Sequence, residues 1–400
     1  MKIAVISNLF EPYQRGGAEK IAKIMADTLA ENHDVFVVSS KPFVTLDSFK
    51  TSMDSYQASF GKEIKVYRYY PLNLFYYLND FKYPAIIRLF WHIIDVFNWD
   101  SANQIAKILE AEKPEIVICH NLKGLGYMLP RKLKKMNIKQ ILVLHDVQYA
   151  VPSGLIIKDR ENSFASDGLF TGWYQDINKL LLKNIDILIS PSKWLGDFYK
   201  EKGFWLDKKI EILNNPIKVD EKLIIKKTTF DNKKINYLFV GQLETHKGIE
   251  LILKQFENKN DILQVVGDGT RFNELKTKYN KINIIFHGKM ENSKLKELYS
   301  QADYVIVPSV CYENSPTVIY EAFNQGIPVI ASNIGGIPEL VAHNQTGWLF
   351  EAGDSISLQK ALENSAKTVN YEAMQQNCLK KVREFDIIKY NEKLNNLLKS

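Results

Sequence analysis

The sequence predicts an α/β protein made of two domains, each built around a parallel sheet. The chain has 400 residues, which exceeds what a single hydrophobic core usually organises. Residues 2–39 follow the order strand, glycine loop, helix, strand, which is how a parallel α/β sheet begins. From Ile235 to Ala331 the same alternation of apolar runs and helical periods starts again. Two α/β domains are therefore expected.

The first half of the chain alternates short apolar runs with helical periods. Residues 2–9 are expected to form a strand, and a loop ending in Arg15-Gly16-Gly17 leads into a helix over Ala18–Ala30. Later strands are expected at Val35–Ser39, Ile64–Tyr70, Ile116–Cys119, Gln140–Leu144 and Ile185–Ile189, with helices that include Ala102–Glu112 and Asn178–Lys183. We interpret this half as one doubly wound domain.

A polar stretch over 218–234 is expected to link the two domains. The second series has strands at Ile235–Val240, Leu263–Val266, Ile282–Phe286, Tyr304–Val307 and Pro328–Ala331, and helices at Ile249–Glu257, Phe272–Tyr279, Ser293–Tyr299 and 316–325. Three further helices are expected over 355–366, 370–384 and 387–399. We therefore assign residues 1–213 to the first domain and 214–384 to the second, with 385–400 packing back on the first.

The composition limits the class of protein. A hydrophobic content of 46% and a charged content of 24% are ordinary for a globular protein, and a net charge of +6 is too mild to indicate a nucleic-acid partner. The three cysteines are far apart and lack metal-binding spacing, which is typical of a reducing compartment. The first residues do not resemble a signal peptide, and no apolar run is long enough to span a bilayer. We expect a cytoplasmic protein.

The stretch from Pro308 to Ile330 predicts a phosphate-binding helix start. A buried strand precedes it, and Pro316 suits the first position of a helix, with Ser315 as the N-cap. The N–H groups of Thr317 and Val318 then have no partner inside the helix, and with the helix dipole they form an anion site.

Two glutamates flank this anion site. Glu313 lies in the loop before the helix, and Glu321 lies inside the helix. A carboxylate on each side of a phosphate site suits a ligand with hydroxyl groups at both ends and phosphate in the middle, which is the shape of a nucleotide sugar. The sequence contains no Asp-x-Asp pair, so we expect no metal ion held by such a pair.

Residues 69–99 are unusually aromatic and apolar, with little charge. One interpretation is a core helix with a packed loop. The alternative is a surface that faces a membrane or a lipid acceptor, because aromatic side chains concentrate at headgroup depth. The sequence leaves both open.

The unit Tyr312-Glu313-Asn314-Ser315-Pro316-Thr317, followed by Glu321-Ala322, resembles the donor site of glycosyltransferase family 4. Other matching pieces are Gly16-Gly17-Ala18-Glu19, His145-Asp146, Gly241, Lys247-Gly248, Gly326-Ile327-Pro328-Val329 and Gly335-Gly336-Ile337-Pro338-Glu339-Leu340. The match covers most of the chain, in the family's order. It implies a retaining enzyme of the GT-B fold, with two facing Rossmann-like domains and parallel sheets, and we expect the C-terminal helix to cross back to the first domain.

The resemblance also implies roles for particular residues. Glu321 binds the ribose hydroxyls, while Glu313 and the backbone from Asn314 through Ser315 to Thr317 hold the sugar, with Thr317 and Val318 near the diphosphate. Lys247 neutralises the diphosphate and supports the leaving group. The three residues expected to act in catalysis are Lys247, Glu313 and His145, the last of which lies near C6 of the reacting sugar. Gly16 and Gly17 let backbone N–H groups approach the diphosphate or the acceptor.

One position departs from the family pattern. The residue after Gly241 is usually Arg, and here it is Gln242, which carries no charge for a phosphate. Gln242 stays among the donor-binding candidates. Either Lys247, with Arg271 or Lys289, carries the diphosphate charge, or the donor geometry differs from that of the family, so two hypotheses stand. The first is a metal-independent hexosyltransferase without a cofactor. It would move a sugar from a nucleoside-diphosphate donor, with UDP as the first choice of nucleotide, to a glycan or lipid-linked glycan. Its role would be in cell-surface polysaccharide synthesis. The alternative is a non-catalytic subunit that binds nucleotide sugars.

Overall fold

The computed structural model describes residues 1–59, 61–219 and 234–399, so most of the expected linker over 218–234 lies outside the described residues. The chain forms two compact units. The first contains Met1–Leu155, Asn162–Pro216 and Tyr390–Ser400, and the second contains Ile156–Glu161 and Ile217–Lys389. The short segment 156–161 thus belongs to the second unit although it lies well before the boundary expected at residue 213.

The sheet of the first unit has the strand order β3-β4-β2-β1-β5-β6-β7-β8. Its strands are β1 (Lys2–Ile6), β2 (Asp34–Ser40), β3 (Ser52–Gln57), β4 (Glu63–Tyr69), β5 (Ile116–Cys119), β6 (Lys139–Val143), β7 (Ile187–Ser190) and β8 (Ile210–Ile212). The pairs are parallel except β3 with β4. β3 was not predicted because it is a polar edge strand, and polar edges carry no continuous apolar run.

Helices cover both faces of this sheet. They are α1 (Gly17–Ala30), α2 (Ala85–Val96), α3 (Trp99–Glu112), α4 (Leu129–Lys135), α5 (Phe164–Asp167), α6 (Leu169–Leu182) and α7 (Lys193–Glu201), joined by the end of α15 (Ile387–Lys399). Met25 and Leu29 of α1 and Leu394 of α15 share one apolar cluster with Ile3 and Val5 of β1. From β1 the chain moves to β2 and β4, whereas from β4 it returns past β1 to β5 and β6. Because crossovers are right-handed, connections that run in opposite directions place their helices on opposite faces, so α3 and α4 lie on the face opposite α1.

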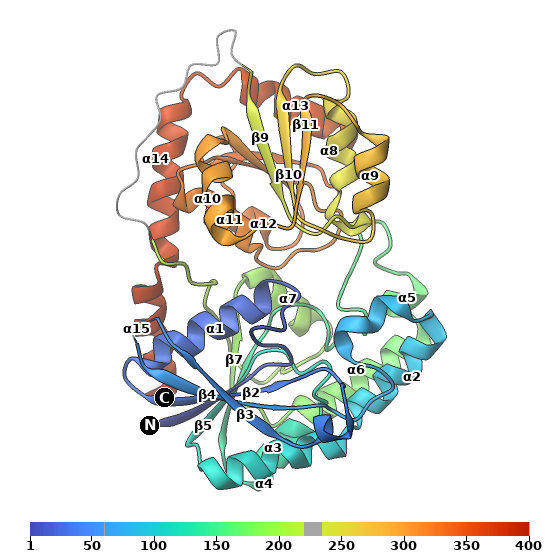
Figure 1. Ribbon diagram of the computed structural model, residues 1–400, viewed down its shortest axis with the longest axis vertical. Helices are drawn as coiled ribbons and strands as arrows, with labels where there is room; N and C mark the ends of the chain where they lie inside the picture. The colour runs from blue at the N-terminus through green and yellow to red at the C-terminus, as the bar shows by residue number, and fades with distance from the viewer. Residues whose placement is uncertain (60, 220–233, 400) are drawn as a thin grey trace. The chain divides into compact units, whose positions relative to one another are not determined.

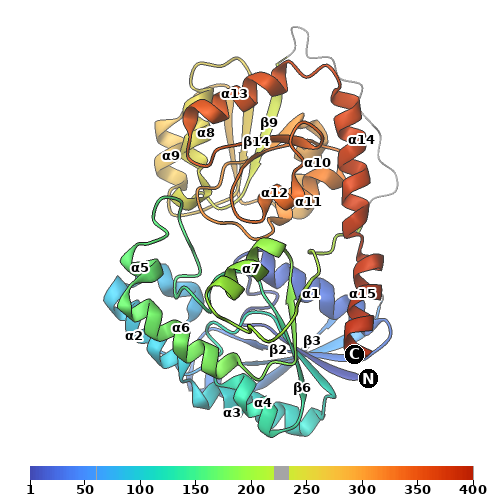
Figure 2. The same ribbon diagram turned by 180° about the vertical axis from the view of Figure 1, so that it is seen from behind.

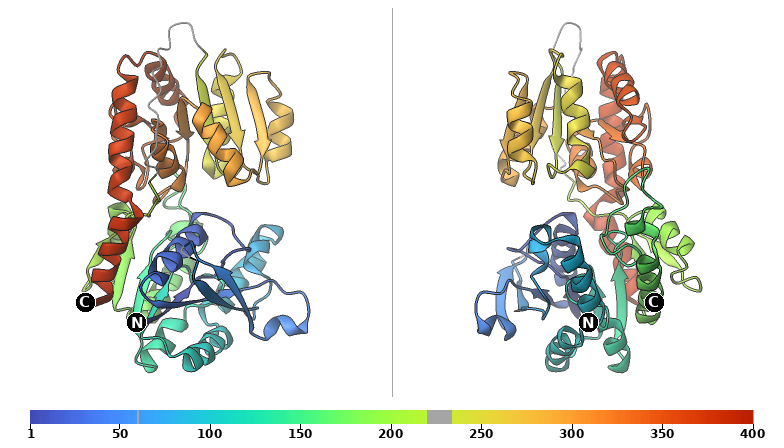
Figure 3. Two further views of the ribbon diagram at one scale, coloured as in Figure 1. Left: turned by 60° about the vertical axis from the view of Figure 1, so that its left-hand side comes forward. Right: turned by 90° about the vertical axis from the view of Figure 1, so that its right-hand side faces the viewer.

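The sheet of the second unit is parallel throughout, in the order β11-β10-β9-β12-β13-β14. Its strands are β9 (Asn236–Val240), β10 (Ile262–Val266), β11 (Ile284–Gly288), β12 (Tyr304–Val307), β13 (Val329–Ser332) and β14 (Gly347–Phe350). Its helices are α8 (Ile249–Phe256), α9 (Phe272–Lys278), α10 (Asn292–Gln301), α11 (Thr317–Asn324), α12 (Ile337–Leu340), α13 (Ser355–Ala366) and α14 (Tyr371–Val382). Figure 3 shows β9, β10 and β11 side by side, and Figure 2 shows α13 and α14 from behind.

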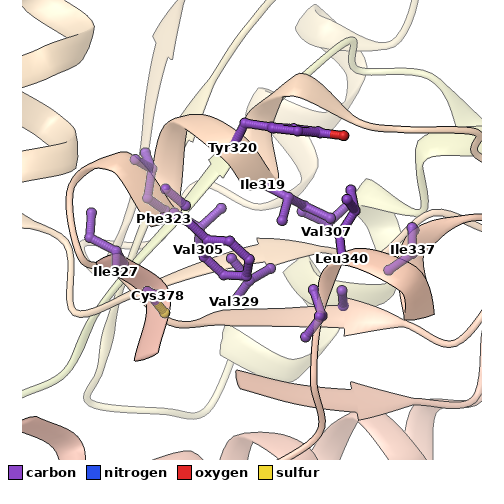
Figure 4. Packing of buried hydrophobic residues seen from close by; sticks show 14 of the residues in the cluster. Val305, Val307, Ile319, Tyr320, Phe323, Ile327, Val329, Ile337, Leu340 and Cys378 are labelled. Atoms are coloured by element: carbon purple, nitrogen blue, oxygen red, sulfur yellow. The ribbon is translucent and has the colours of Figure 1, made fainter. Parts of the chain in front are cut away.

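Alternating residues of these strands enter two separate apolar clusters. Val305 and Val307 pack with α11, α12 and α14, as Figure 4 shows, whereas Tyr304 and Ile306 pack with α8, α9 and α13. Because side chains on a strand alternate between faces, a strand that is apolar at every position is buried on both sides. Each Val or Ile buried in this way stabilises the fold by roughly 1.5–3 kcal/mol. The predicted α/β class with two parallel-dominated sheets is confirmed.

Candidate functional site in the second unit

The strand order of the second unit creates a switch point between β9 and β12. The chain moves from β9 outward to β10 and β11, then returns to the other side of β9 at β12. Ligands of open parallel sheets bind outside the carboxyl ends of the strands at such a point. The loops that follow β9 and β12 carry Lys247 and Glu313, so the topology brings these two side chains together.

Glycines let the backbones of these loops touch. Gly248 has a φ of +69°, and a Cβ on it would lie 1.8 Å from the carbonyl oxygen of Pro308. Gly335 has a φ of +61°, and its Cβ would lie 2.2 Å from the carbonyl oxygen of Glu313, which accepts a hydrogen bond from the N–H of Gly336 at 2.8 Å. Neither position has room for a side chain, which fixes the separation of the loops and hence of Lys247 from Glu313.

Replacing Gly248 with alanine is expected to lower the free energy of unfolding by about 3 kcal/mol or more, because backbone atoms must move apart. Gly288→Ala is the matched control. Its φ is +72°, but its Cβ would meet nothing closer than 3.8 Å, so only the conformational cost of about 1 kcal/mol remains. Chemical denaturation of both variants measures the difference, and equal losses would contradict the close approach at Gly248.

Lys247 and Glu313 form an ion pair in which Nζ lies 2.6 Å from Oε1. The side chains are 27% and 16% exposed. Burial acts to lower the pKa of Lys247, but attraction to Glu313 outweighs it and raises the pKa. Burial likewise acts to raise the pKa of Glu313, but attraction to Lys247 and hydrogen bonds from Lys247 and Ser309 lower it. Both groups therefore stay charged at neutral pH.

Two further side chains contact the Glu313 carboxylate. Ser309 donates its hydroxyl to Oε1 at 2.8 Å, and the Cys311 thiol lies 3.7 Å from the same oxygen. Cys311 is buried, and burial raises the pKa of its thiol. A protonated thiol is a weak donor and not a nucleophile, so Cys311 supports Glu313.

The start of α11 differs slightly from the prediction. Pro316 is the N-cap and the helix begins at Thr317, so the expectation of Ser315 as N-cap and Pro316 as first helical residue is wrong by one position. The Ser315 hydroxyl instead pairs with Tyr320 at 2.5 Å, a buried partner that the local pattern cannot reveal. Thr317 and Val318 are the first two residues of the helix, and Asn314 is buried beside it.

Glu321 lies one turn further along α11, and its Oε2 accepts a hydrogen bond from Tyr299 of α10 at 3.0 Å. Gln242 lies in the loop after β9, where its carbonyl accepts a hydrogen bond from the N–H of Glu244. Sequence reasoning named Glu321 and Gln242 but missed Tyr299, because nothing in a helical period marks a tyrosine as the partner of a residue on the next helix.

The segment 156–161 braces the loop that carries Glu313. Ile157 forms an antiparallel bridge with Cys311, and the N–H of Tyr312 donates to the carbonyl of Ile156 at 2.9 Å. The Tyr312 hydroxyl also donates to Glu161 at 2.9 Å. The residues on both sides of Cys311 are thus held by a segment from the first half of the chain, which no local pattern predicts.

Candidate residues in the first unit

The first unit also has a switch point, between β1 and β5, and the loop after β1 ends at Gly16 and Gly17. Gly17 is the first residue of α1, and Gly16 is its N-cap. The Glu19 carboxylate accepts a hydrogen bond from the N–H of Gly16 at 2.9 Å. Burial raises the pKa of Glu19. This carboxylate occupies one of the N–H groups that were expected to face a ligand.

His145 lies after β6, and its Nε2 is 2.9 Å from Nδ1 of His120, which follows β5. On the other side of the His120 ring, Nε2 lies 3.3 Å from Sδ of Met25. A thioether has no proton to give, so the Nε2 of His120 carries the proton and its Nδ1 accepts. We infer that His145 donates through Nε2, which leaves its Nδ1 as an acceptor.

Burial holds both imidazoles neutral. It lowers the pKa of His145 to about 4 and that of His120 well below its ordinary value. Sequence reasoning named His145 and missed His120, although the same signal marks both, since each follows a buried strand at the carboxyl edge of the sheet.

Within the described parts of the chain, no group of three or more His, Cys, Asp or Glu side chains is arranged to hold a metal ion. Among the helices of those same parts, none combines the length and the apolar character needed to cross a bilayer.

Comparison with known proteins

Proteins of known sequence match most of this chain's length. A protein of the cps region of Klebsiella pneumoniae is 26% identical over 343 residues, which cover 85% of this chain and 87% of that protein. An uncharacterised glycosyltransferase of Methanocaldococcus jannaschii is 26% identical over 383 residues, covering 89% of this chain and 87% of that protein.

Solved structures share its fold. Sucrose-phosphate synthase from Thermosynechococcus elongatus superposes with a TM-score of 0.75 at 16% identity, covering 100% of this chain and 98% of that one. Anabaena HepE in complex with UDP superposes with a TM-score of 0.70 at 16% identity, with 100% of both chains covered. At this identity the likeness shows the fold, which is that of the GT-B glycosyltransferases.

Two family models match the chain. The model described as "Glycosyl transferases group 1" matches residues 220–382. The model described as "Glycosyltransferase Family 4" matches residues 15–221, more than half of the chain. The protein whose sheets, loops and ion pair are described above therefore belongs to glycosyltransferase family 4.

Proposed function

We propose that this glycosyltransferase moves a hexose from a nucleoside-diphosphate sugar, with UDP as the first choice of nucleotide, to a hydroxyl of a glycan or lipid-linked glycan. The observation that carries the proposal is the Lys247–Glu313 ion pair beside the start of α11 at the switch point of the second unit. A cation and a helix N-terminus suit a diphosphate, and a carboxylate suits sugar hydroxyls.

Two comparisons support the substrate class. HepE was crystallised with UDP and with UDP-glucose, and this chain shares its fold. The relative from Klebsiella pneumoniae is a protein of the cps region, which favours a role in cell-surface polysaccharide synthesis. Three buried cysteines with free thiols favour a cytoplasmic location, and a lipid-linked acceptor would be met at the inner face of a membrane.

The proposed chemistry stabilises the leaving group. Charge grows on the β-phosphate as the glycosidic bond breaks, and the Lys247 ammonium has three N–H donors, so it can keep Glu313 and still bind a phosphate oxygen. The N–H groups at Thr317 and Val318 add donors without any metal ion. Retention of configuration would follow if the departing phosphate takes the acceptor proton on the same face of the sugar.

His145 has a matching role in this proposal. The ring is held beside His120, with its Nε2 2.9 Å from Nδ1 of His120, and it would lie near C6 of the reacting sugar. Gly16 and Gly17 would bring backbone N–H groups toward the diphosphate or the acceptor, with one N–H already held by Glu19.

A non-catalytic nucleotide-sugar-binding subunit is the second candidate, and Gln242 favours it because this position offers no charge for the diphosphate. A thermal-shift screen of nucleoside diphosphates and their sugars identifies the donor, because a ligand that binds the folded state raises its stability. Release of nucleoside diphosphate with a glycan acceptor present then decides between the two. Donor binding without any release would rule out the enzyme.

Replacing Glu321 with alanine is expected to weaken donor binding by about 1–3 kcal/mol, because the ribose hydroxyls lose a charged acceptor. Tyr299→Phe is the control, since it removes the hydroxyl that Glu321 accepts from and keeps the carboxylate. Calorimetry with the donor should show the larger loss for Glu321→Ala. Unchanged affinity in that variant would refute the assignment to ribose.

A further inference from the structure

The outer face of α2 is apolar and exposed. Ile86, Phe90 and Ile94 are spaced four residues apart, which puts them on one stripe of the helix, and they are 60%, 56% and 37% exposed. The opposite side of the helix is buried through Trp91 and Val96. The interpretation of residues 69–99 as a core helix therefore fits only one face of α2, and large apolar side chains exposed together mark an interaction site.

This stripe continues onto α6, which lies beside α2 in Figures 1 and 2. The rings of Phe97 and Trp173 are 6.3 Å apart, and both are about two-fifths exposed. Leu169, one turn before Trp173 on the same side of α6, is 92% exposed. We call the set the α2–α6 surface; it consists of Ile86, Phe90, Ile94, Phe97, Leu169 and Trp173.

The exposed charges on α2 and just before it are basic. Between residues 81 and 97 the exposed charged side chains are Lys82 and Arg88, both basic. The acidic residue in this range, Asp95, is buried, and its carboxylate accepts hydrogen bonds from the N–H of Gly124 at 2.9 and 3.0 Å. On α6, Asp176 is paired with Lys179. The part of the stripe on α2 is therefore apolar with a basic border.

We propose that the α2–α6 surface binds the surface of an anionic lipid bilayer, with its rings and aliphatic side chains at headgroup depth and Lys82 and Arg88 on lipid phosphates. Aromatic and aliphatic side chains with basic neighbours are the composition of helices that lie in a membrane interface. A second copy of the chain is disfavoured as the occupant, because a two-fold contact through the same patch would bring Arg88 of each copy toward basic side chains of the other.

This inference rests on the proposed function in one respect: a lipid-linked acceptor is carried by the bilayer that the surface would bind. Binding would hold the enzyme where that acceptor is concentrated, so turnover on it should depend on the α2–α6 surface. Turnover on a short water-soluble glycan should not.

Co-sedimentation of the full chain with vesicles tests the proposal. Vesicles of phosphatidylglycerol mixed with phosphatidylcholine should bind the protein, pure phosphatidylcholine should bind it less, and added salt should weaken the binding. The variant Phe90→Ser with Ile94→Ser should lower the partition coefficient at least ~10-fold, and Arg88→Glu should lower it on anionic vesicles only. The matched control is Ile282→Ser with Val369→Ser, two apolar residues of the second unit that are 101% and 94% exposed.

Circular dichroism and thermal midpoints confirm that each variant folds. Equal vesicle binding by the wild type and the Phe90/Ile94 variant would overturn the proposal. So would the finding that vesicles bind neither protein and that the wild type forms a concentration-dependent dimer which the variant does not form. Loss of vesicle binding with unchanged turnover on a soluble glycan separates the surface from the active site. Absent turnover on every acceptor, with vesicle binding intact, would instead reject the proposed function alone.

Discussion

Replacing Lys247 with alanine is expected to lower kcat by about 10²–10³-fold, the loss typical of removing one donor to charge that develops in a transition state. The dissociation constant of the donor should rise by less, because the diphosphate of the intact donor carries less charge at the leaving oxygen than the departing diphosphate does. Steady-state release of nucleoside diphosphate gives kcat, and calorimetry gives the dissociation constant.

Lys254→Ala is the control for that experiment, since this lysine lies exposed on α8, the helix that follows the Lys247 loop. It should change neither quantity. Equal losses of kcat and donor affinity in Lys247→Ala would make Lys247 a simple binding residue. An unchanged kcat would remove it from the mechanism.

Replacing Glu313 with alanine is expected to cost about 3 kcal/mol of unfolding free energy, because it leaves the Lys247 ammonium in a largely buried place without its carboxylate. Changing both residues together, Lys247→Met with Glu313→Leu, should recover the stability to within about 1 kcal/mol of the wild type, since no charge is then left unpaired. Both variants should be inactive. Chemical denaturation gives the stability, and recovered activity in the double variant would contradict the proposed roles.

The same pair predicts how stability depends on pH. The folded-state pKa of Glu313 is lowered, so its contribution is present at neutral pH and lost as the pH falls through that value. The folded-state pKa of Lys247 is raised, so its contribution is lost only as the pH rises through that value. The stability difference between the wild type and the double variant should therefore be largest around neutral pH and shrink toward both extremes.

The sequence predicted five strands of the second unit because strands buried on both faces are apolar at every position, as Tyr304–Val307 is. It missed β14 (Gly347–Phe350), in which Trp348 and Leu349 are only partly buried. It predicted that Lys247 and Glu313 lie on loops near a helix start. It could not predict that the ammonium and the carboxylate touch, because they are 66 residues apart and meet only through the strand order. The contacts of segment 156–161 with the loop that carries Glu313, and the contact of His120 with Met25, also join residues far apart in the sequence and could not be predicted from local patterns.

The sequence also could not predict which face of α2 is exposed to solvent. A helix that is apolar on two sides has the same sequence pattern whether the second side packs against a core or faces solvent. Residues 85–96 could therefore be assigned to a helix but not to a surface. The polar strand β3 shows the converse, since its edge position needs no apolar pattern at all.

The segments that each unit takes from the other half of the chain have a consequence for how the protein is made. The first unit is completed by Tyr390, Leu394 and Leu398 of α15, which join its core. The second unit needs Ile156–Glu161 from far upstream. Because the ribosome releases the chain from its N-terminus, the core of the first unit cannot be completed until residues 390–398 have been synthesised. Cutting the chain near residue 216 would therefore leave each of the two pieces without a segment that completes its unit.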